Sequence, residues 1–264
     1  MNVARRLGLE VANPVTLSDA NNLVLWLRPA PVVVKVATGH HQRLHLELSV
    51  GHHLQGEHAP AVAPAAALPQ EVHRGDGFEM TFWRYEPTDC SEPSPGAIAA
   101  ALFELHKALR TYPRPLPSFQ DELVAVCGVL ADRHRAPALP QRGRQILRRA
   151  LGDLTAELRQ LAPSELPIHG SPHSGNQIAR TGFVRFLDFE TTGRGPVEWD
   201  LAHVDPEIAL NYPAEVDPRV LAVCRGLVSA KTATWCWAKY DHPDLRWHAE
   251  HHLEVVEDLL GSAG

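Results

Sequence analysis

Hydrophobic and polar positions in the first third of the chain follow the pattern of paired strands. Residues 22–28 (NLVLWLR) and 31–37 (PVVVKVA) have the β-branched and alternating character of paired strands, and the intervening PAP predicts a turn. Residues 77–87 (GFEMTFWRYEP) predict a further strand. Residues 41–55 lack proline, and their mixed apolar pattern predicts a helix. The alanine- and proline-rich residues 58–72 predict an extended connection between these elements.

The rest of the chain is mainly helical in pattern. Residues 94–113 and 143–163 place apolar residues at steps of three and four, which predicts two amphipathic helices. Further helical segments follow the hairpin described below, from VEWDLAHVDPEIALN to the C-terminus. Turn-forming residues and three prolines between Glu86 and Gly96 indicate a boundary. We therefore predict an α+β protein with a small strand-rich lobe (1–86), a hinge near residues 84–95 and a larger helical lobe (87–264).

A polar loop carries the first candidate chemistry. Residues 166–176 (LPIHGSPHSGN) read as a short strand followed by this loop, and a predicted β-hairpin then leads to LDFE at residues 187–190. Asn176 and Asp188 offer the hard oxygen ligands that Mg²⁺ prefers. The spacing therefore predicts a magnesium site formed by Asn176 and Asp188.

A second candidate lies in the strand-rich segment. Lys35 has apolar neighbours, so its ammonium needs an acidic partner or a phosphate. Glu47, twelve residues further on in the predicted helix, is a candidate partner, and Glu57 is an alternative. A strand lysine held by a helix glutamate, with an asparagine and an aspartate for metal, is the working set of protein-kinase-type phosphoryl transfer.

Three motifs together resemble a known family. HGSPHSGN, LDFE and GPVEWDLA are similar to the H-G-D-x-H-x-x-N, D-F-[GE] and G-x-x-x-x-D-L-A motifs of the aminoglycoside phosphotransferase and choline kinase family. The resemblance implies a bilobal protein kinase-like fold. It also implies Mg²⁺-dependent transfer of the γ-phosphoryl of ATP or GTP to a hydroxyl of an antibiotic or metabolite. Asp200 of GPVEWDLA would brace the catalytic loop.

The resemblance also assigns nucleotide contacts. Lys35, held by Glu47, would touch the α- and β-phosphates. The turn SDANN, which contains Asn21 and Asn22, would lie over the phosphates, although it lacks the glycines of protein kinases. The segment around Arg84 and Tyr85 would form the hinge beside the adenine.

The resemblance fails at Ser171, which stands where the family has the aspartate that accepts the proton of the substrate hydroxyl. A serine hydroxyl cannot act as that base near neutral pH. His173 and Glu190 are candidate substitute bases, but His173 could instead hold the loop's shape, and Glu190 could instead pair with Arg194. Two hypotheses stay open: a slow small-molecule kinase, and a pseudokinase that binds a nucleotide or a partner without turnover.

Composition narrows the remaining function classes. The net charge of −6 argues against a general nucleic-acid binder. No window approaches the apolar length of a membrane span, so we expect a cytoplasmic protein. The acidic residues between 205 and 217 suit a cationic acceptor or a solvated surface equally well, and the acceptor and the oligomeric state are left open.

Aromatic and histidine side chains near the C-terminus leave two further alternatives. Trp235, Trp237 and Trp247 could cage a quaternary ammonium or pack in the core. His248 and His252 stand one helical turn apart, as do His41 and His45, which suits either a metal site or solvent-facing helix positions.

Overall fold

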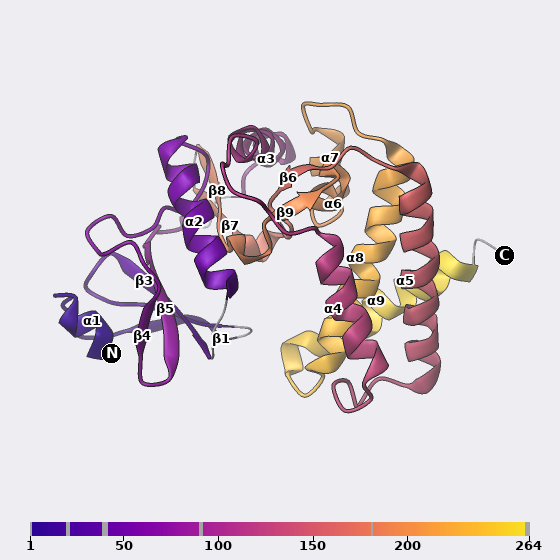
Figure 1. Cartoon of the computed structure of the whole chain (residues 1–264), viewed down its shortest axis with the longest axis horizontal. Coiled ribbons are helices and arrows are strands. Elements are labelled where there is room, and N and C mark those ends of the chain that lie inside the picture. The colour runs from indigo at the N-terminus through magenta and orange to yellow at the C-terminus, as the bar shows by residue number, and fades with distance from the viewer. Residues whose placement is uncertain (1, 20–21, 39–41, 90–91, 181, 262–264) are drawn as a thin grey trace. The chain divides into compact units, whose positions relative to one another are not determined.

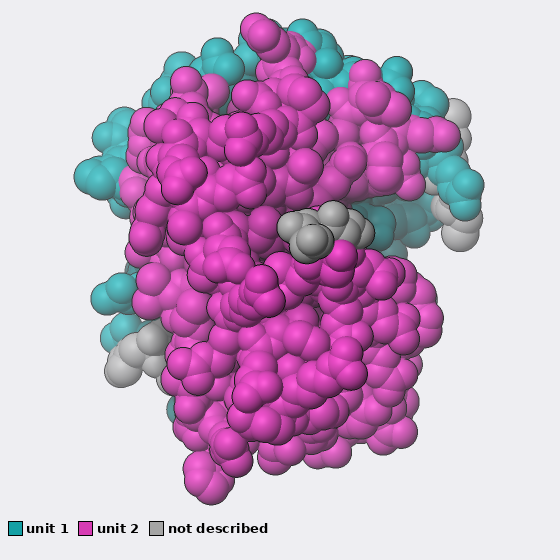
Figure 2. Space-filling view, turned by 90° about the vertical axis from the view of Figure 1, so that its right-hand side faces the viewer, with its two compact units in different colours: residues 1–115, 171–192, 211–213 teal, residues 116–170, 193–210, 214–264 magenta. Residues whose placement is uncertain are grey.

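The computed structural model describes residues 2–19, 22–38, 42–89, 92–180 and 182–261 (Figure 1). The chain forms two compact units, which Figure 2 shows in different colours. Unit 1 comprises residues 1–115, 171–192 and 211–213, and unit 2 comprises residues 116–170, 193–210 and 214–264. This is a division by compactness, and the lobe boundary near residues 84–95 stays a prediction.

A five-stranded antiparallel sheet organises unit 1, with its strands in the order β1-β2-β3-β5-β4. The strands are β1 (Val15–Asp19), β2 (Leu23–Trp26), β3 (Val32–Thr38), β4 (His73–Gly75) and β5 (Phe78–Arg84). The predicted strands β2, β3 and β5 are confirmed. The edge strands β1 and β4 escaped prediction because they are short and partly polar and lack the pattern of a half-buried strand.

The other elements of unit 1 are three helices and a hairpin. The helices are α1 (Asn2–Arg6), α2 (Gln42–Gly56) and α3 (Pro95–Leu109). The hairpin consists of β7 (Gln177–Arg180) and β8 (Phe183–Phe186). The 3₁₀ turns η1 (Ser174–Asn176) and η2 (Phe189–Thr191) flank it. The side chain of Ser94 caps α3, and Pro95 occupies the first turn, as helix starts favour. One apolar face of the sheet packs on α1 through Val3 and Ala4. The predicted helices α2 and α3 are confirmed.

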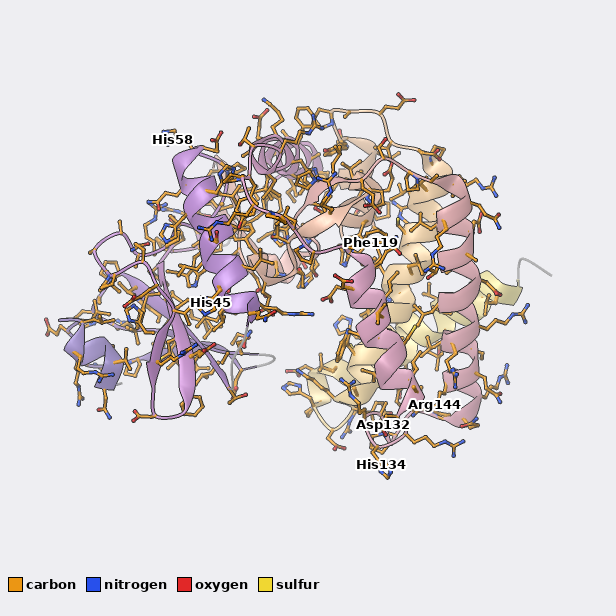
Figure 3. All side chains as sticks on the ribbon, viewed as in Figure 1. His45, His58, Phe119, Asp132, His134 and Arg144 are labelled. Carbon is orange, nitrogen blue, oxygen red and sulfur yellow. The ribbon has the colours of Figure 1, made fainter. Side chains whose placement is uncertain are left out.

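Unit 2 is built on four helices that share one apolar core: α4 (Gln120–Ala131), α5 (Gln141–Leu161), α8 (Pro218–Ala238) and α9 (Pro243–Gly261). The amphipathic prediction for α5 is confirmed, because its leucines from Leu147 to Leu158 are buried. Arg144 of α5, labelled in Figure 3, is also buried. It donates to the carbonyl oxygens of Leu130 (2.8 Å) and Ala136 (2.7 Å), which ties α5 to the end of α4 and the following loop.

The short elements of unit 2 include the segment that carries GPVEWDLA. β6 (Leu166–Ile168) pairs with β9 (Gly193–Gly195), and α6 (Val197–Leu201) and α7 (Pro206–Leu210) follow. The helical segment predicted at residues 197–211 is therefore two short helices, because Pro206 starts a new helix rather than continuing the first.

The predicted α+β class is confirmed, with a sheet in the N-terminal part and helices in the C-terminal part. Within the described ranges, no helix has both the length and the apolar character needed to cross a membrane.

Candidate functional site

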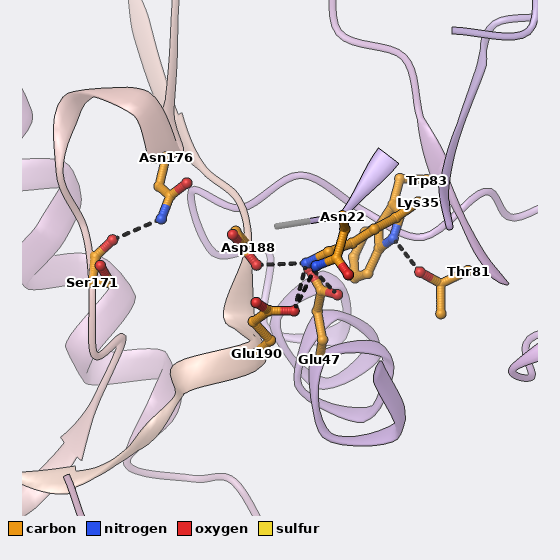
Figure 4. A network of polar contacts seen from close by, with 9 residues as sticks. All are labelled: Asn22, Lys35, Glu47, Thr81, Trp83, Ser171, Asn176, Asp188 and Glu190. Atoms are coloured by element: carbon orange, nitrogen blue, oxygen red, sulfur yellow. Dashed lines mark hydrogen bonds and ion pairs between the residues drawn. The ribbon is translucent and has the colours of Figure 1, made fainter. Parts of the chain in front are cut away.

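The side chain of Lys35 lies at the centre of an acidic cluster in unit 1 (Figure 4). Lys35 is on the central strand β3 and is 6% exposed. Its Nζ lies 3.0 Å from Oε2 of Glu47, 2.6 Å from Oδ1 of Asp188 and 3.0 Å from Oε2 of Glu190. The predicted ion pair with Glu47 is thus present, and the structure adds two further carboxylates to it.

Close packing of α2 on the sheet brings Glu47 to Lys35. A Cβ atom at Gly51, one helical turn after Glu47, would lie 2.7 Å from the ring of Trp83, so only glycine allows this approach. Trp83 is itself fixed, because its Nε1 donates to Oγ1 of buried Thr81, which stands opposite Lys35 in the sheet. The alternative partner Glu57 follows the end of α2 and is exposed.

The end of the β7–β8 hairpin supplies the other two carboxylates. Asp188 has a left-handed backbone (φ 67°, ψ 65°), a conformation that aspartate tolerates better than most residues. Glu190 follows in η2, and its Oε2 also accepts a hydrogen bond from Nδ2 of Asn22 at 3.2 Å. Asn22, which directly precedes β2, is thereby joined to a residue that lies far away in the sequence.

The electrostatic balance of the cluster favours a cation. One ligand oxygen from each of Glu47, Asp188 and Glu190 lies within 4.8 Å of the others, so three carboxylates share one ammonium. Burial alone would lower the pKa of Lys35, but attraction to the carboxylates outweighs it and raises the pKa above its ordinary value. Burial raises the pKa of Glu47 to about 8, although Lys35 opposes the shift. The two directions together indicate a permanently charged lysine beside a carboxyl that holds a proton more tightly than usual.

The side-chain amide of Asn176 has a fixed orientation. The residue is 9% exposed, and its Nδ2 donates to the backbone oxygen of Ser171 at 2.9 Å. This bond fixes the amide so that its oxygen points away from Ser171, as Figure 4 shows. Asn176 and Asp188 lie at the same end of the hairpin, since the carbonyl of Asn176 accepts from the N–H of Leu187. The asparagine oxygen and the carboxylate, whose side chain is 30% exposed, are the hard donors that Mg²⁺ takes from proteins.

The predicted role of Asp200 as a brace is confirmed within unit 2. Its carboxylate is fully buried and accepts from the N–H groups of His169 (2.7 Å) and Gly170 (2.8 Å). The indole of Trp199 donates to the carbonyl of Gly170 at 2.9 Å. Both the N–H groups and a carbonyl of the backbone just before Ser171 are therefore held by hydrogen bonds.

Three other predicted catalytic and nucleotide-contacting residues have partners within unit 1. The exposed His173 accepts from the N–H of Gly175 through Nδ1, which caps the turn η1 and agrees with a role in loop shape. Arg84 donates to the carboxylate of Glu86. The ring of Tyr85 stacks on that of Trp26, with centroids 3.8 Å apart. Asn21 lies outside the described residues.

Two contacts of this region were missed by the sequence prediction. Trp26 was not singled out as a partner of Tyr85, and Asn22 was expected to face phosphates rather than Glu190. No local signal could have found them, because each joins residues that are far apart in the chain. Glu190 has Lys35 and Asn22 as partners, whereas the guanidinium of Arg194 donates to the carbonyl of Glu165.

The C-terminal acidic and aromatic residues have structural explanations. Asp217 caps α8 by accepting from the N–H groups of residues 219 and 220, and Asp205 accepts from the N–H of residue 207. Trp237 is 6% exposed and belongs to the core of unit 2, and Trp235 packs against that core, whereas Trp247 is 62% exposed. For Trp235 and Trp237 core packing is confirmed.

Comparison with known proteins identifies similar sequences and folds. The family model described as "Phosphotransferase enzyme family" matches residues 14–251. A choline/ethanolamine kinase family protein from Mesorhizobium loti is 16% identical, with a TM-score of 0.71, over 98% of this chain and 94% of the other. The amicoumacin kinase hAmiN in complex with AMP-PNP, Ca²⁺ and Ami is 13% identical, with a TM-score of 0.76, over 97% and 92%.

A third solved structure, the GDP and kanamycin complex of APH(2")-IIia, is 13% identical, with a TM-score of 0.68, over 97% of this chain and 96% of the other. No curated protein matches the sequence. At these identities the solved structures establish the fold, and the predicted kinase-like fold is confirmed.

Proposed function

The chain belongs to the phosphotransferase enzyme family, and from this premise we propose that it binds a nucleoside triphosphate with Mg²⁺ and transfers the γ-phosphoryl to a hydroxyl of a small molecule. One observation carries the proposal. The buried ammonium of Lys35 is held by Glu47 and lies 2.6 Å from Asp188, so the proposed phosphate-binding lysine lies beside one of the two proposed metal ligands.

Each residue has a role that its surroundings support. Lys35 contacts the α- and β-phosphates, and Glu47 on α2 fixes the position of its ammonium. Asn176 and Asp188 hold Mg²⁺, which when bound offsets the negative charge of the phosphate oxygens during transfer. Asp200 keeps the backbone before Ser171 in place through two hydrogen bonds. Asn22 reaches the same phosphates from the β1–β2 turn.

The nucleotide and the acceptor are proposed as classes. The related folds include one bound to AMP-PNP and one bound to GDP, which supports a purine nucleotide, ATP or GTP. Arg84 and Tyr85 belong to the hinge beside the base, where the stacked rings of Tyr85 and Trp26 form an aromatic edge. The acceptor is an antibiotic, such as an aminoglycoside, or a metabolite, since kanamycin and Ami accompany the nucleotides in those complexes.

Ser171 makes slow turnover part of the proposal. It occupies the position at which the family's aspartate accepts the hydroxyl proton, and a general base contributes about 10²- to 10⁴-fold. His173 and Glu190 are the candidate substitute bases, and both have structural contacts. The same serine favours a second candidate function, a pseudokinase that binds nucleotide without transferring phosphate.

Titration calorimetry with Mg-ATP and Mg-GTP tests the binding step. We expect binding to the wild-type protein and at least about tenfold weaker binding to Asp188→Asn, a loss of ~1.4 kcal/mol. Asp153→Asn is the matched control, because Asp153 forms an exposed ion pair with Arg149 on α5. Absence of binding at millimolar concentrations of both nucleotides would refute the proposal.

Turnover of Ser171→Asp separates the two candidate functions. If the protein is a slow kinase, restoring the carboxylate raises phosphoryl transfer to an accepted hydroxyl compound by about 10²-fold or more. A screen of aminoglycosides and amino alcohols with radiolabelled ATP and GTP supplies the readout. If both the wild type and Ser171→Asp bind nucleotide but neither transfers phosphate, the pseudokinase is favoured.

A further inference from the structure

The ammonium of Lys35 is surrounded by three carboxylates. A lysine ammonium has three N–H donors. Nζ donates hydrogen bonds to Asp188 at 2.6 Å and Glu47 at 3.0 Å, whereas Oε2 of Glu190, at 3.0 Å, forms an ion pair with it. Two of the donors are thus held by Asp188 and Glu47, so a phosphate oxygen would reach the third by taking the place of Glu190.

Glu190 is the carboxylate whose contacts match those of a phosphate. Its Oε2 lies 3.0 Å from Nζ of Lys35 and accepts from Nδ2 of Asn22 at 3.2 Å (Figure 4). One anionic oxygen thus bridges the two groups that are proposed to bind nucleotide phosphates.

The other two carboxylates are less suited to displacement. Glu47 is 2% exposed and is held within α2. Asp188 uses Oδ1 for Lys35, and its carboxylate is the proposed metal ligand.

We propose that Glu190 occupies the phosphate position of the nucleotide-free protein, and that its displacement makes the protein select metal-complexed over free nucleoside triphosphate. The inference rests on the proposed function. A free triphosphate adds several negative charges beside Asp188 and the displaced Glu190, and like charges in a partly buried site repel strongly. A triphosphate that arrives with Mg²⁺ brings compensating positive charge, so the same displacement costs less.

Nucleotide affinity with and without metal tests the inference directly. Competition against a fluorescent ATP analogue is measured in excess Mg²⁺ and in EDTA. We expect the wild-type protein to prefer Mg-ATP over metal-free ATP at least about tenfold (~1.4 kcal/mol). Glu190→Gln should bind metal-free ATP about tenfold more tightly than the wild type does. The ratio between the affinities for Mg-ATP and metal-free ATP should therefore be smaller in this variant.

Two further variants complete the design. Glu104→Gln removes the same charge from an exposed ion pair with Lys107 on α3, and both of its affinities should equal those of the wild type. Glu190→Asp keeps the charge but withdraws the carboxylate by one methylene, and an intermediate gain in affinity for metal-free ATP is expected. This variant keeps the test decisive if circular dichroism shows that Glu190→Gln is unfolded.

The outcomes distinguish the inference from the proposed function. Equal affinity of the wild type for both forms of ATP would overturn the inference. So would a Glu190→Gln protein that binds Mg-ATP more weakly while its affinity for metal-free ATP is unchanged, since Glu190 would then act only as a metal ligand. If no protein binds either form, the proposed function fails and the inference falls with it.

Discussion

Replacement of Lys35 by methionine tests how strongly the three carboxylates depend on one ammonium. Methionine keeps the apolar stem of the side chain on β3 but leaves Glu47, Asp188 and Glu190 together without a counter-charge. Removing one partner of a buried ion pair costs about 3–5 kcal/mol. Because the side chain of Asp188 is 30% exposed and solvent screens part of the repulsion, we expect the lower end, about 3 kcal/mol at pH 8.5.

The cost should depend on pH with a defined sign. The pKa of Glu47 is raised by burial to about 8 in the presence of Lys35, and loss of the lysine's attraction raises it further. A carboxyl pKa that is raised in the folded state contributes stability at low pH, and this contribution is lost as the pH rises through the folded-state value. The destabilisation should therefore be smallest near pH 5, where Glu47 is protonated, and largest above pH 8.

Urea denaturation of the metal- and nucleotide-free protein at pH 5.5 and pH 8.5 measures both values. Lys107→Met is the matched control, because the ion pair of Lys107 with Glu104 is just as short at 2.9 Å but is about half exposed, and such pairs contribute at most about 1 kcal/mol. Addition of Glu47→Gln to Lys35→Met should recover part of the loss at pH 8.5. An equal cost at both pH values, or a cost no larger than that of Lys107→Met, would refute the reasoning.

Two further predictions concern unit 2. Asp200→Asn leaves one of the buried N–H groups of His169 and Gly170 without its carboxylate acceptor, so we expect a loss of about 1–3 kcal/mol in the free energy of unfolding and faster amide exchange at both residues. Unchanged exchange at both amides would contradict the bracing role. Burial and the neighbouring histidines lower the pKa of His252 to about 4, so stability present near pH 7 should fall as the pH drops toward 4. The urea midpoint should fall less steeply in His252→Gln, whereas His134→Gln, in an exposed loop, should follow the wild type; identical slopes in all three proteins would argue against this assignment.

Elements with a local pattern could be predicted from the sequence. The alternating and β-branched character of residues 22–28 and 31–37 predicted β2 and β3, and the leucine spacing predicted α5, because residues that repeat at the period of a strand or helix share one face. The order of Lys35, Asn176 and Asp188, together with the three motifs, was enough to indicate a phosphotransferase. The edge strands β1 and β4 were missed, because they are short and partly polar.

Which charged side chains contact one another depends on the fold. The sequence left open whether Glu190 acts as a base or pairs with Arg194. It also left open whether Lys35 pairs with Glu47 or with Glu57. Packing of α2 through Gly51 and the left-handed turn at Asp188 set the actual partners. These partners lie up to 168 residues apart, as with Asn22 and Glu190, so no local pattern specifies their contact. The sequence shows which charged residues the chain contains, but only folding brings three carboxylates next to a single ammonium.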